Sequence, residues 1–329
     1  MSSFDYYDDK FVPAGYGFRN MGATCYFNAM LQALTSCSSF NKLLVENRSV
    51  EEYKKNAVIK YFTQMLAVAY KNPHDSQLGE SSPYIWSKIF EYIKTRSDGH
   101  IFTAGQQDAE EGFHMFMEAI DAFQPLQDLF KHRYESIVYC PDCKEDVSRK
   151  MSENIIFKVE PNLKIEQLEK FKELDSSYGK TVDLNYFLCQ QNTSVDKDFK
   201  CPKCKVKSEK FMKIRLRMVP EILVVVSQKY THDKKRGSKK LDNLTNFPET
   251  LEFNGSADGK KFTMQFDAVA QIEHTGSLRS GHYWAVCKRK DGWKTLNDSS
   301  VSPGKFKTTK NTYIVFYHIS STKSQSRND

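Results

Sequence analysis

Four cysteines arranged as two C-P-x-C pairs limit most strongly how this 329-residue chain can fold. Cys140 and Cys143 form the first pair and Cys201 and Cys204 the second, and 57 residues separate the two pairs. A C-x-x-C turn brings two thiolates to one metal, and two such turns complete a tetrahedral site. Four soft thiolates without an open position favour one structural zinc ion per chain, although an iron–sulfur cluster and a redox pair remain alternatives. We therefore predict two hairpins that meet at a metal, as in a zinc ribbon.

The remaining composition argues against a disulfide-linked extracellular domain. The chain has eight cysteines, but it is long, and its N-terminus lacks the apolar core of a signal peptide. No apolar run approaches the length of about 18 residues that a transmembrane helix needs. The net charge of +7 is modest for this length, and the basic cluster at 234–240, read as a solvated loop, contains no aromatic residue for base stacking. We expect a cytoplasmic or nuclear protein that binds neither membranes nor nucleic acids.

The apolar periodicity changes near residue 133. Residues 17–130 read mostly as helices, whereas later segments alternate apolar and polar residues as half-buried strands do. The run at 222–226 is continuously apolar and suits a buried strand. Helices followed by antiparallel strands indicate an α+β fold.

A fifth cysteine, Cys25, lies where a glycine-containing turn runs into a helix, in the stretch GFRNMGATCYFNAMLQAL at 17–34. A lone cysteine is most often an inert buried residue. Here Thr24 is the expected N-cap, and a helix N-terminus favours thiolate and lowers the thiol pKa. The backbone N–H groups of the NMGAT segment can also point at a developing oxyanion. Cys25 is therefore a candidate nucleophile.

A base for this thiol lies far downstream. His282 begins a predicted strand, and Asn297 and Asp298 follow after a turn at 291–292. The two ends of a hairpin meet, so His282 and Asn297 can be neighbours. The imidazole can then take the proton from sulfur while its neighbour fixes the tautomer. His274 is a second candidate base, but no amide or carboxylate lies at hairpin distance from it.

These segments together resemble the ubiquitin-specific proteases, which are papain-like deubiquitinases. Residues 17–34 resemble the cysteine box of the family, and HTGSLRSGHYWAV with GWKTLNDSSVSP, within 274–303, resembles its histidine box. GQQDAEEGFHMFMEAI at 105–120 is similar to the intermediate segment, and the two C-x-x-C pairs match the zinc ribbon of the fingers. The resemblance runs in order from about residue 14 to 318.

The resemblance implies a division of the chain. An α+β papain-like cysteine protease fold is expected, with a helical thumb at about 14–132, zinc-ribbon β fingers at about 133–215, including an insert, and an antiparallel β palm at about 216–318. Residues 1–13 would form an N-terminal extension, and residues 319–329 a polar C-terminal tail.

The resemblance also implies roles for individual residues. Cys25 would be the nucleophile, His282 the general base and Asn297 its orienting partner. Asn20 would donate its amide to the oxyanion, and Asp298 would support that region. The remaining implied roles are substrate contacts and metal ligands: Asp108 and Glu111 would meet the basic C-terminal tail of ubiquitin, Gly281 and Tyr283 would shape the tunnel for its terminal Gly-Gly, and Cys140, Cys143, Cys201 and Cys204 would hold zinc.

The implied reaction is hydrolysis of isopeptide or peptide bonds after the C-terminal glycine of ubiquitin, through a Cys25 acyl-enzyme. Ubiquitin and ubiquitinated proteins would be the partners, and we expect a monomer. A catalytically weak ubiquitin-binding scaffold and a protease for another ubiquitin-like modifier are the alternatives. Departures from the family pattern, such as Phe266, Ala268 and Gly112, concern packing and substrate contacts rather than the catalytic set.

Overall fold

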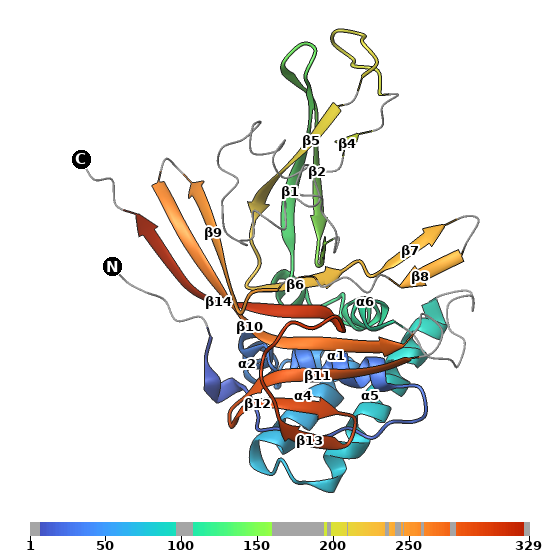
Figure 1. Cartoon of the computed structure of the whole chain (residues 1–329). Coiled ribbons are helices and arrows are strands. Elements are labelled where there is room, and N and C mark those ends of the chain that lie inside the picture. The colour runs from blue at the N-terminus through green and yellow to red at the C-terminus, as the bar shows by residue number, and fades with distance from the viewer. Residues whose placement is uncertain are drawn as a thin grey trace.

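The computed structural model describes residues 7–96, 108–159, 194–195, 199–208, 210–233, 237–240, 245, 247–257, 260–276 and 281–325. In this described part, helices come first, one four-stranded sheet projects from the body, and an eight-stranded sheet lies against the helices (Figure 1). The prediction of an α+β fold is confirmed.

The helical part surrounds one buried helix. Its elements are η1 (Asp9–Phe11), α1 (Cys25–Leu34), α2 (Ser38–Glu46), α3 (Glu51–Lys55), α4 (Ala57–Lys71), α5 (Ser76–Arg96), α6 (Ala109–Ala119) and α7 (Gln124–Asp128). All ten residues of α1 are buried, because α1 packs between the large sheet on one side and α5 and α6 on the other. Among the helices described, none is both long and apolar enough to cross a bilayer.

The four-stranded sheet forms the fingers that project away from the helices (Figure 1). Its strand order is β2-β1-β5-β4, and all of its pairings are antiparallel. The strands are β1 (His132–Cys140), β2 (Glu145–Asn154), β4 (Ser194–Val195) and β5 (Lys210–Met218). A separate hairpin pairs β7 (Tyr230–Asp233) with β8 (Gly237–Lys240), so part of the basic cluster forms a strand rather than the predicted loop.

The eight-stranded sheet forms the palm. Its order is β13-β12-β11-β10-β14-β6-β3, and β9 also pairs with β10. Only the pairing of β3 with β6 is parallel among the described strands. The strands are β3 (Phe157–Val159), β6 (Ile222–Ser227), β9 (Thr250–Ala257), β10 (Lys260–Gly276), β11 (Gly281–Arg289), β12 (Gly292–Asn297), β13 (Ser300–Pro303) and β14 (Thr312–Gln325).

Both faces of the palm sheet are covered at β6. Every residue of this strand is buried. Val224 and Val226 join the core that the sheet shares with the helices, whereas Leu223 and Val225 join a second core on the opposite face. Burial on both faces explains why the run is apolar without alternation.

The structure differs from the predicted division of the chain at three places. Residues 319–325, assigned to a polar tail, continue β14 and pair with β10. In the predicted N-terminal extension, the Phe11 carbonyl accepts hydrogen bonds from Asn41 Nδ2, at 2.8 Å, and from the Tyr70 hydroxyl. β3, inside the predicted finger range, belongs to the palm sheet. Backbone pairing thus holds residues 319–325 in the palm sheet, and side-chain donors hold the N-terminal segment at Phe11. The amino-acid composition of these segments does not reveal such contacts.

Arg289, at the end of β11, is a buried cation that binds the C-terminal end of α1. Only 3% of this residue is exposed. Its guanidinium donates to the Gln32 carbonyl at 2.8 Å and to the Gln32 side-chain oxygen at 2.6 Å, and also to the hydroxyls of Thr35, at 2.8 Å, and Ser36. The carbonyl end of a helix carries partial negative charge and favours a cation. Arg289 therefore fixes one end of α1 on β11.

Replacing this cation tests how much it contributes to the fold. Arg289→Met should lower the free energy of unfolding by about 2–4 kcal/mol, because buried oxygens at the end of α1 would lose charged donors. Denaturant unfolding measures the change. Lys290→Met removes the neighbouring exposed cation and should cost less than about 0.5 kcal/mol. Equal stability of Arg289→Met and wild type would show that the guanidinium does not hold α1 on β11.

Candidate active site and metal centre

The β11–β12 hairpin brings His282 and Asn297 together as predicted. The turn closes at Gly292, whose φ of +93° lies in the left-handed region that favours glycine. His282 Nε2 lies 2.6 Å from Asn297 Oδ1, and the imidazole stacks on Trp284 with ring centroids 6.3 Å apart. Because an amide oxygen only accepts, Nε2 carries the proton of the neutral ring. The basic lone pair of His282 is therefore on Nδ1.

Cys25 is the first residue of α1, and its thiol lies at the start of β11. The residue is 3% exposed. The backbone N–H groups of Tyr283, Tyr26 and Cys25 itself lie within hydrogen-bonding reach of the sulfur. Tyr283 directly follows His282, so the thiol is located at the strand end that carries the base. The helix N-terminus also directs its N–H groups to the sulfur, as predicted.

The pKa of the Cys25 thiol is nevertheless raised. Burial is the largest cause and the Asp298 charge adds to it, while the N–H groups of Tyr283, Tyr26 and Cys25 oppose the shift. Desolvation penalises the thiolate more than these donors stabilise it. The prediction of a lowered thiol pKa is therefore wrong for this structure, because burial outweighs the helix terminus. Ionisation requires transfer of the proton to an imidazole.

The loop before α1 is closed by its own side chains. Thr24 occupies the N-cap position, but its hydroxyl accepts the Met21 N–H at 3.0 Å and makes no cap to the helix. Asn20 Oδ1 accepts the N–H groups of Gly22, at 2.9 Å, and Thr24, at 3.3 Å. Thr24 is thus the N-cap residue, as predicted, although without a capping hydrogen bond, and the N–H groups of Gly22 and Thr24 are already engaged. The loop instead fixes the orientation of the Asn20 amide.

Asn20 and Asp298 face one another beside the base. Asn20 Nδ2 donates to Asp298 Oδ2 at 2.9 Å. An amide has two N–H bonds, so one N–H of Asn20 remains for an oxyanion. Asp298 adopts a left-handed φ of 49°, its carbonyl accepts the Phe18 N–H at 2.8 Å, and its Oδ2 lies 4.0 Å from His282 Nε2. The structure thus gathers all of the predicted catalytic residues at one place.

Asp108 is engaged by internal hydrogen bonds. It is the N-cap of α6 and accepts the Glu110 N–H at 2.7 Å. The hydroxyls of Tyr313, at 2.9 Å, and Tyr283, at 3.2 Å, also donate to its carboxylate, and burial raises its pKa. These contacts give Asp108 a role in holding Tyr283. Glu111 is half-buried, and burial, followed by the charges of Asp108 and Glu110, raises its pKa.

Gly281 and His274 are tightly packed behind the site. A Cβ at position 281 would lie 2.4 Å from His274 Nε2 and equally close to the Thr275 carbonyl, so a larger residue does not fit. His274 is 3% exposed and stacks on the Tyr283 ring with centroids 4.3 Å apart. His274 is therefore a packing residue in this structure. Residues 277–280, within the segment that resembles the histidine box, lie outside the described residues.

The four cysteines of the two C-P-x-C pairs converge at the tip of the fingers. The sulfurs of Cys140 and Cys204 are 3.7 Å apart, those of Cys143 and Cys201 are 4.0 Å apart, and all four lie within 4.8 Å of one another. Tetrahedral zinc with bonds of about 2.3 Å places its sulfur ligands about 3.8 Å apart. The cluster therefore fits one metal ion with four thiolate ligands.

The two cysteine turns share a backbone geometry. Lys144 and Lys205, each directly after a C-P-x-C pair, have left-handed φ values of 57° and 61°. The N–H groups of Lys203 and Cys204 donate to the Cys201 sulfur at 3.4 Å each. Burial opposes ionisation of Cys201, yet these donors help lower its pKa to about 6. In the second turn, these donors stabilise the thiolate form of Cys201, which is the form that binds metal.

The family model for ubiquitin carboxyl-terminal hydrolase matches residues 16–317. The chain belongs to this family. It is 26% identical to ubiquitin carboxyl-terminal hydrolase 26 of Arabidopsis thaliana, over 91% of this chain and 27% of that protein. It is 21% identical to ubiquitin carboxyl-terminal hydrolase 8 of Saccharomyces cerevisiae, over 92% of this chain and 70% of that protein. The chain thus spans about a quarter of the plant relative and most of the yeast relative.

The fold is similar to a solved structure of the SAGA deubiquitinase module Ubp8/Sgf11/Sus1/Sgf73 bound to monoubiquitin. The TM-score is 0.72 at 18% identity, and the match covers 97% of this chain and 71% of that chain. The same module bound to ubiquitin aldehyde gives the same TM-score and coverage. The predicted arrangement of thumb, palm and fingers is therefore confirmed as a fold.

Two contacts near Cys25 were not predicted from the sequence. Asn28, one helical turn after Cys25, donates to Asp298 Oδ1 at 2.8 Å. Gly112 on α6 lies against the Tyr26 ring, where an added Cβ would come within 3.1 Å of two ring carbons. The sequence feature that could have indicated Asn28 is a polar amide within a mostly apolar helix. Gly112, noted as a departure from the family pattern, is explained by the approach of this ring.

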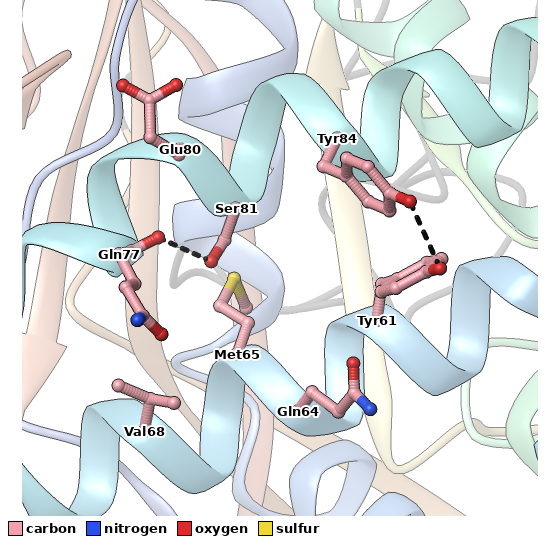
Figure 2. A pocket seen from close by; sticks show the side chains of 8 residues that line it. All are labelled: Tyr61, Gln64, Met65, Val68, Gln77, Glu80, Ser81 and Tyr84. Carbon is pink, nitrogen blue, oxygen red and sulfur yellow. Dashed lines mark hydrogen bonds between the residues drawn. The ribbon is translucent and has the colours of Figure 1, made fainter.

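A separate pocket lies between α4 and α5 and contains none of the predicted catalytic residues. Its volume is about 270 Å³. In Figure 2, Tyr61 and Met65 of α4 face Ser81 and Tyr84 of α5, and the two tyrosine hydroxyls lie 3.2 Å apart. Glu80 on its rim pairs with Arg19, of the loop before α1, at 2.9 Å. The pocket is thus adjacent to the catalytic loop but separate from the site.

The charge of Asp298 gives a test of the thiol environment. Asp298→Asn should lower the pKa of Cys25, because a negative charge that disfavours thiolate is removed. The pH midpoint of Cys25 alkylation by iodoacetamide, followed by peptide mass spectrometry, should therefore move to lower pH. Asp291 lies in the neighbouring turn and pairs with Lys294. Asp291→Asn therefore serves as the control and should leave the pH midpoint of alkylation unchanged. A midpoint that stays in place or rises in Asp298→Asn would contradict this assignment.

Proposed function

We propose that the protein is a deubiquitinase that hydrolyses isopeptide or peptide bonds after the C-terminal glycine of ubiquitin. The observation that carries this proposal is the contact of His282 with Asn297, beside a thiol at the N-terminus of α1. Family membership and the similarity of the fold to a ubiquitin-bound deubiquitinase support the choice of ubiquitin. The presence of nucleophile, base and orienting amide favours an enzyme over a ubiquitin-binding scaffold.

The geometry assigns a role to each side chain in the proposed reaction. His282 Nδ1 takes the proton of Cys25 as sulfur attacks the carbonyl carbon of the terminal glycine. The free N–H of Asn20 and the Cys25 N–H stabilise the oxyanion. The imidazolium then gives its proton to the leaving amine, which leaves a thioester. Water, deprotonated by His282, attacks the thioester and releases the ubiquitin carboxylate and the thiol.

We propose that the finger cluster holds one structural zinc ion. The sulfur spacing, the paired turns and the donors to Cys201 all suit four thiolate ligands. Zinc would join the turn between β1 and β2 to the turn before β5 and would supply folding free energy. The seven cysteines that the structure describes form no disulfide, which suits a reducing compartment such as the cytoplasm or nucleus.

Crossed cysteine variants separate chemistry from metal binding. Cys25→Ser should lose hydrolysis of a ubiquitin C-terminal fluorogenic substrate while it keeps one zinc per chain. Cys140→Ser should lose zinc and become less soluble, because metal binding is folding free energy. Activity assays and elemental analysis of unchelated protein measure both outcomes.

Electrophilic probes carrying ubiquitin or a ubiquitin-like modifier then identify the substrate. We expect the ubiquitin probe to label Cys25. If only a probe that carries another modifier labels Cys25, that modifier is the substrate instead of ubiquitin. Full activity of Cys25→Ser would rule out the thiol mechanism. Zinc-free wild type would refute the metal assignment.

Glu111 is the acidic group best placed to meet the basic tail of ubiquitin. Its charge influences Tyr26, the residue after the nucleophile, so it lies beside the site. The carboxylate of Asp108 already accepts hydrogen bonds from two tyrosine hydroxyls and caps α6. Glu111 instead has like charges as neighbours, and its charge can be reversed without loss of the α6 cap. Glu111 is therefore the better position for testing substrate contact.

Charge reversal at this position should weaken substrate binding. Glu111→Lys should lower kcat/KM for ubiquitin substrates about tenfold or more, chiefly through KM, because an attractive charge contact becomes repulsive. Steady-state kinetics measures the effect. Glu118→Lys on the same helix reverses an exposed charge and serves as the matched control. Equal kinetics for the two variants would assign Glu111 to a solvated helix face.

A further inference from the structure

Asn28 is a buried amide that links Asp298 to the loop before α1 and to α5. It lies on α1, one turn after Cys25, and is 2% exposed. Its Nδ2 donates to Asp298 Oδ1 at 2.8 Å and to the Arg19 carbonyl at 3.2 Å. Its Oδ1 accepts the hydroxyl of Ser82. The two bonds from Nδ2 fix which way the amide points, because exchange of its oxygen and nitrogen would place the oxygen against two groups that only accept.

The bond from Asn28 occupies one oxygen of a carboxylate whose other oxygen serves the site. Asp298 Oδ2 accepts from Asn20 at 2.9 Å and lies 4.0 Å from His282 Nε2. A carboxylate held at only one oxygen can rotate. If it rotated towards the imidazolium, it would compete with Asn297 for Nε2. The Asn20 amide would then lose the partner that aims it.

Ser82 connects this amide to α5. It is fully buried, and the same helical region binds the loop before α1. The Gly79 carbonyl accepts the Arg19 N–H at 2.8 Å, and Glu80 pairs with the Arg19 side chain at 2.9 Å. The first turns of α5 thus hold both the loop and the Asn28 amide. The carboxylate of Asp298 is therefore positioned from a helix that bears no predicted catalytic residue.

We propose that Asn28, oriented by Ser82, is a positioning residue for the reaction. It holds the Asp298 carboxylate away from His282 and keeps the Asn20 donor aimed at the oxyanion. This inference rests on the proposed function, since the reaction to which it applies is ubiquitin hydrolysis. Because Asn28 is buried and acts through Asp298, its loss should act on turnover rather than on substrate binding.

Asn28→Ala tests this role through the separation of kcat from KM. We expect kcat for a ubiquitin C-terminal substrate to fall about ten- to a hundredfold, with KM within about twofold of wild type. Asn28→Asp keeps the shape and the acceptor for Ser82 but faces Asp298 with a second carboxylate, so its kcat should fall at least as far. Ser82→Ala leaves the N–H donors of Asn28 in place and should therefore lower kcat less, by about two- to fivefold.

Asn41→Ala is the matched control for a purely structural effect. Asn41 is also a fully buried amide, and its Nδ2 donates to the carbonyls of Phe11, at 2.8 Å, and Thr35, at 2.9 Å. Loss of Asn41 should lower Tm about as much as loss of Asn28 while leaving kcat unchanged. Equal kcat losses in the two variants would show that Asn28 acts only through stability.

A crystal structure of Asn28→Ala gives a result that does not depend on ubiquitin. We expect Asp298 Oδ2 to leave Asn20 and to approach His282 Nε2 more closely than the 4.0 Å of the present structure. A carboxylate that remains on Asn20, or a kcat equal to wild type, would overturn the inference. Inactive wild type would refute the proposed function, and the position of Asp298 in the variant would still decide this inference.

Discussion

The candidate site depends on how α1 lies along β11, because the proposed nucleophile is on the helix and the proposed base is on the strand. The two elements run in the same direction and are joined at both ends. At the start, the Tyr283 N–H reaches the Cys25 sulfur. At the far end, Arg289 binds the Gln32 carbonyl in the last turn of the helix and the hydroxyl of Thr35, its C-cap. A helix held at two separated points cannot slide along the strand, so the thiol and the imidazole keep their relative position.

The elements around this pair add constraints from other directions. On α6, the Asp108 carboxylate holds the Tyr283 hydroxyl, and Gly112 leaves room for the Tyr26 ring. On α5, Ser82 orients Asn28. Buried polar groups of this kind are costly when they lose a partner, so each contact resists displacement of the site. Catalytic geometry is thus supported by side chains that sit several segments away along the chain.

The sequence predicts those parts of the site that are local or are paired by a hairpin. Cys25 at a helix start, and His282 with Asn297 across one turn, follow from spacing, and the C-P-x-C pairs indicate that their sulfurs converge. What could not be predicted depends on contacts between distant segments. The partners of Asn28, the two tyrosines on Asp108 and the carbonyls bound by Arg289 become neighbours only in the folded protein. The same applies to the thiol pKa, because burial outweighs the helix terminus and burial is a tertiary property.

A raised thiol pKa is compatible with catalysis when charge is stabilised where it develops. In the resting protein, burial and Asp298 disfavour negative charge on sulfur. As the thiol adds to a carbonyl, negative charge moves from sulfur to oxygen, and the donors available there are the free N–H of Asn20 and the helix N-terminus. A resting thiolate would be stabilised by the backbone N–H groups at the helix N-terminus, which would lower the energy of the ground state. In the proposed reaction, burial that disfavours the resting thiolate leaves this electrostatic stabilisation for the tetrahedral species, and only such differential stabilisation accelerates the chemical step.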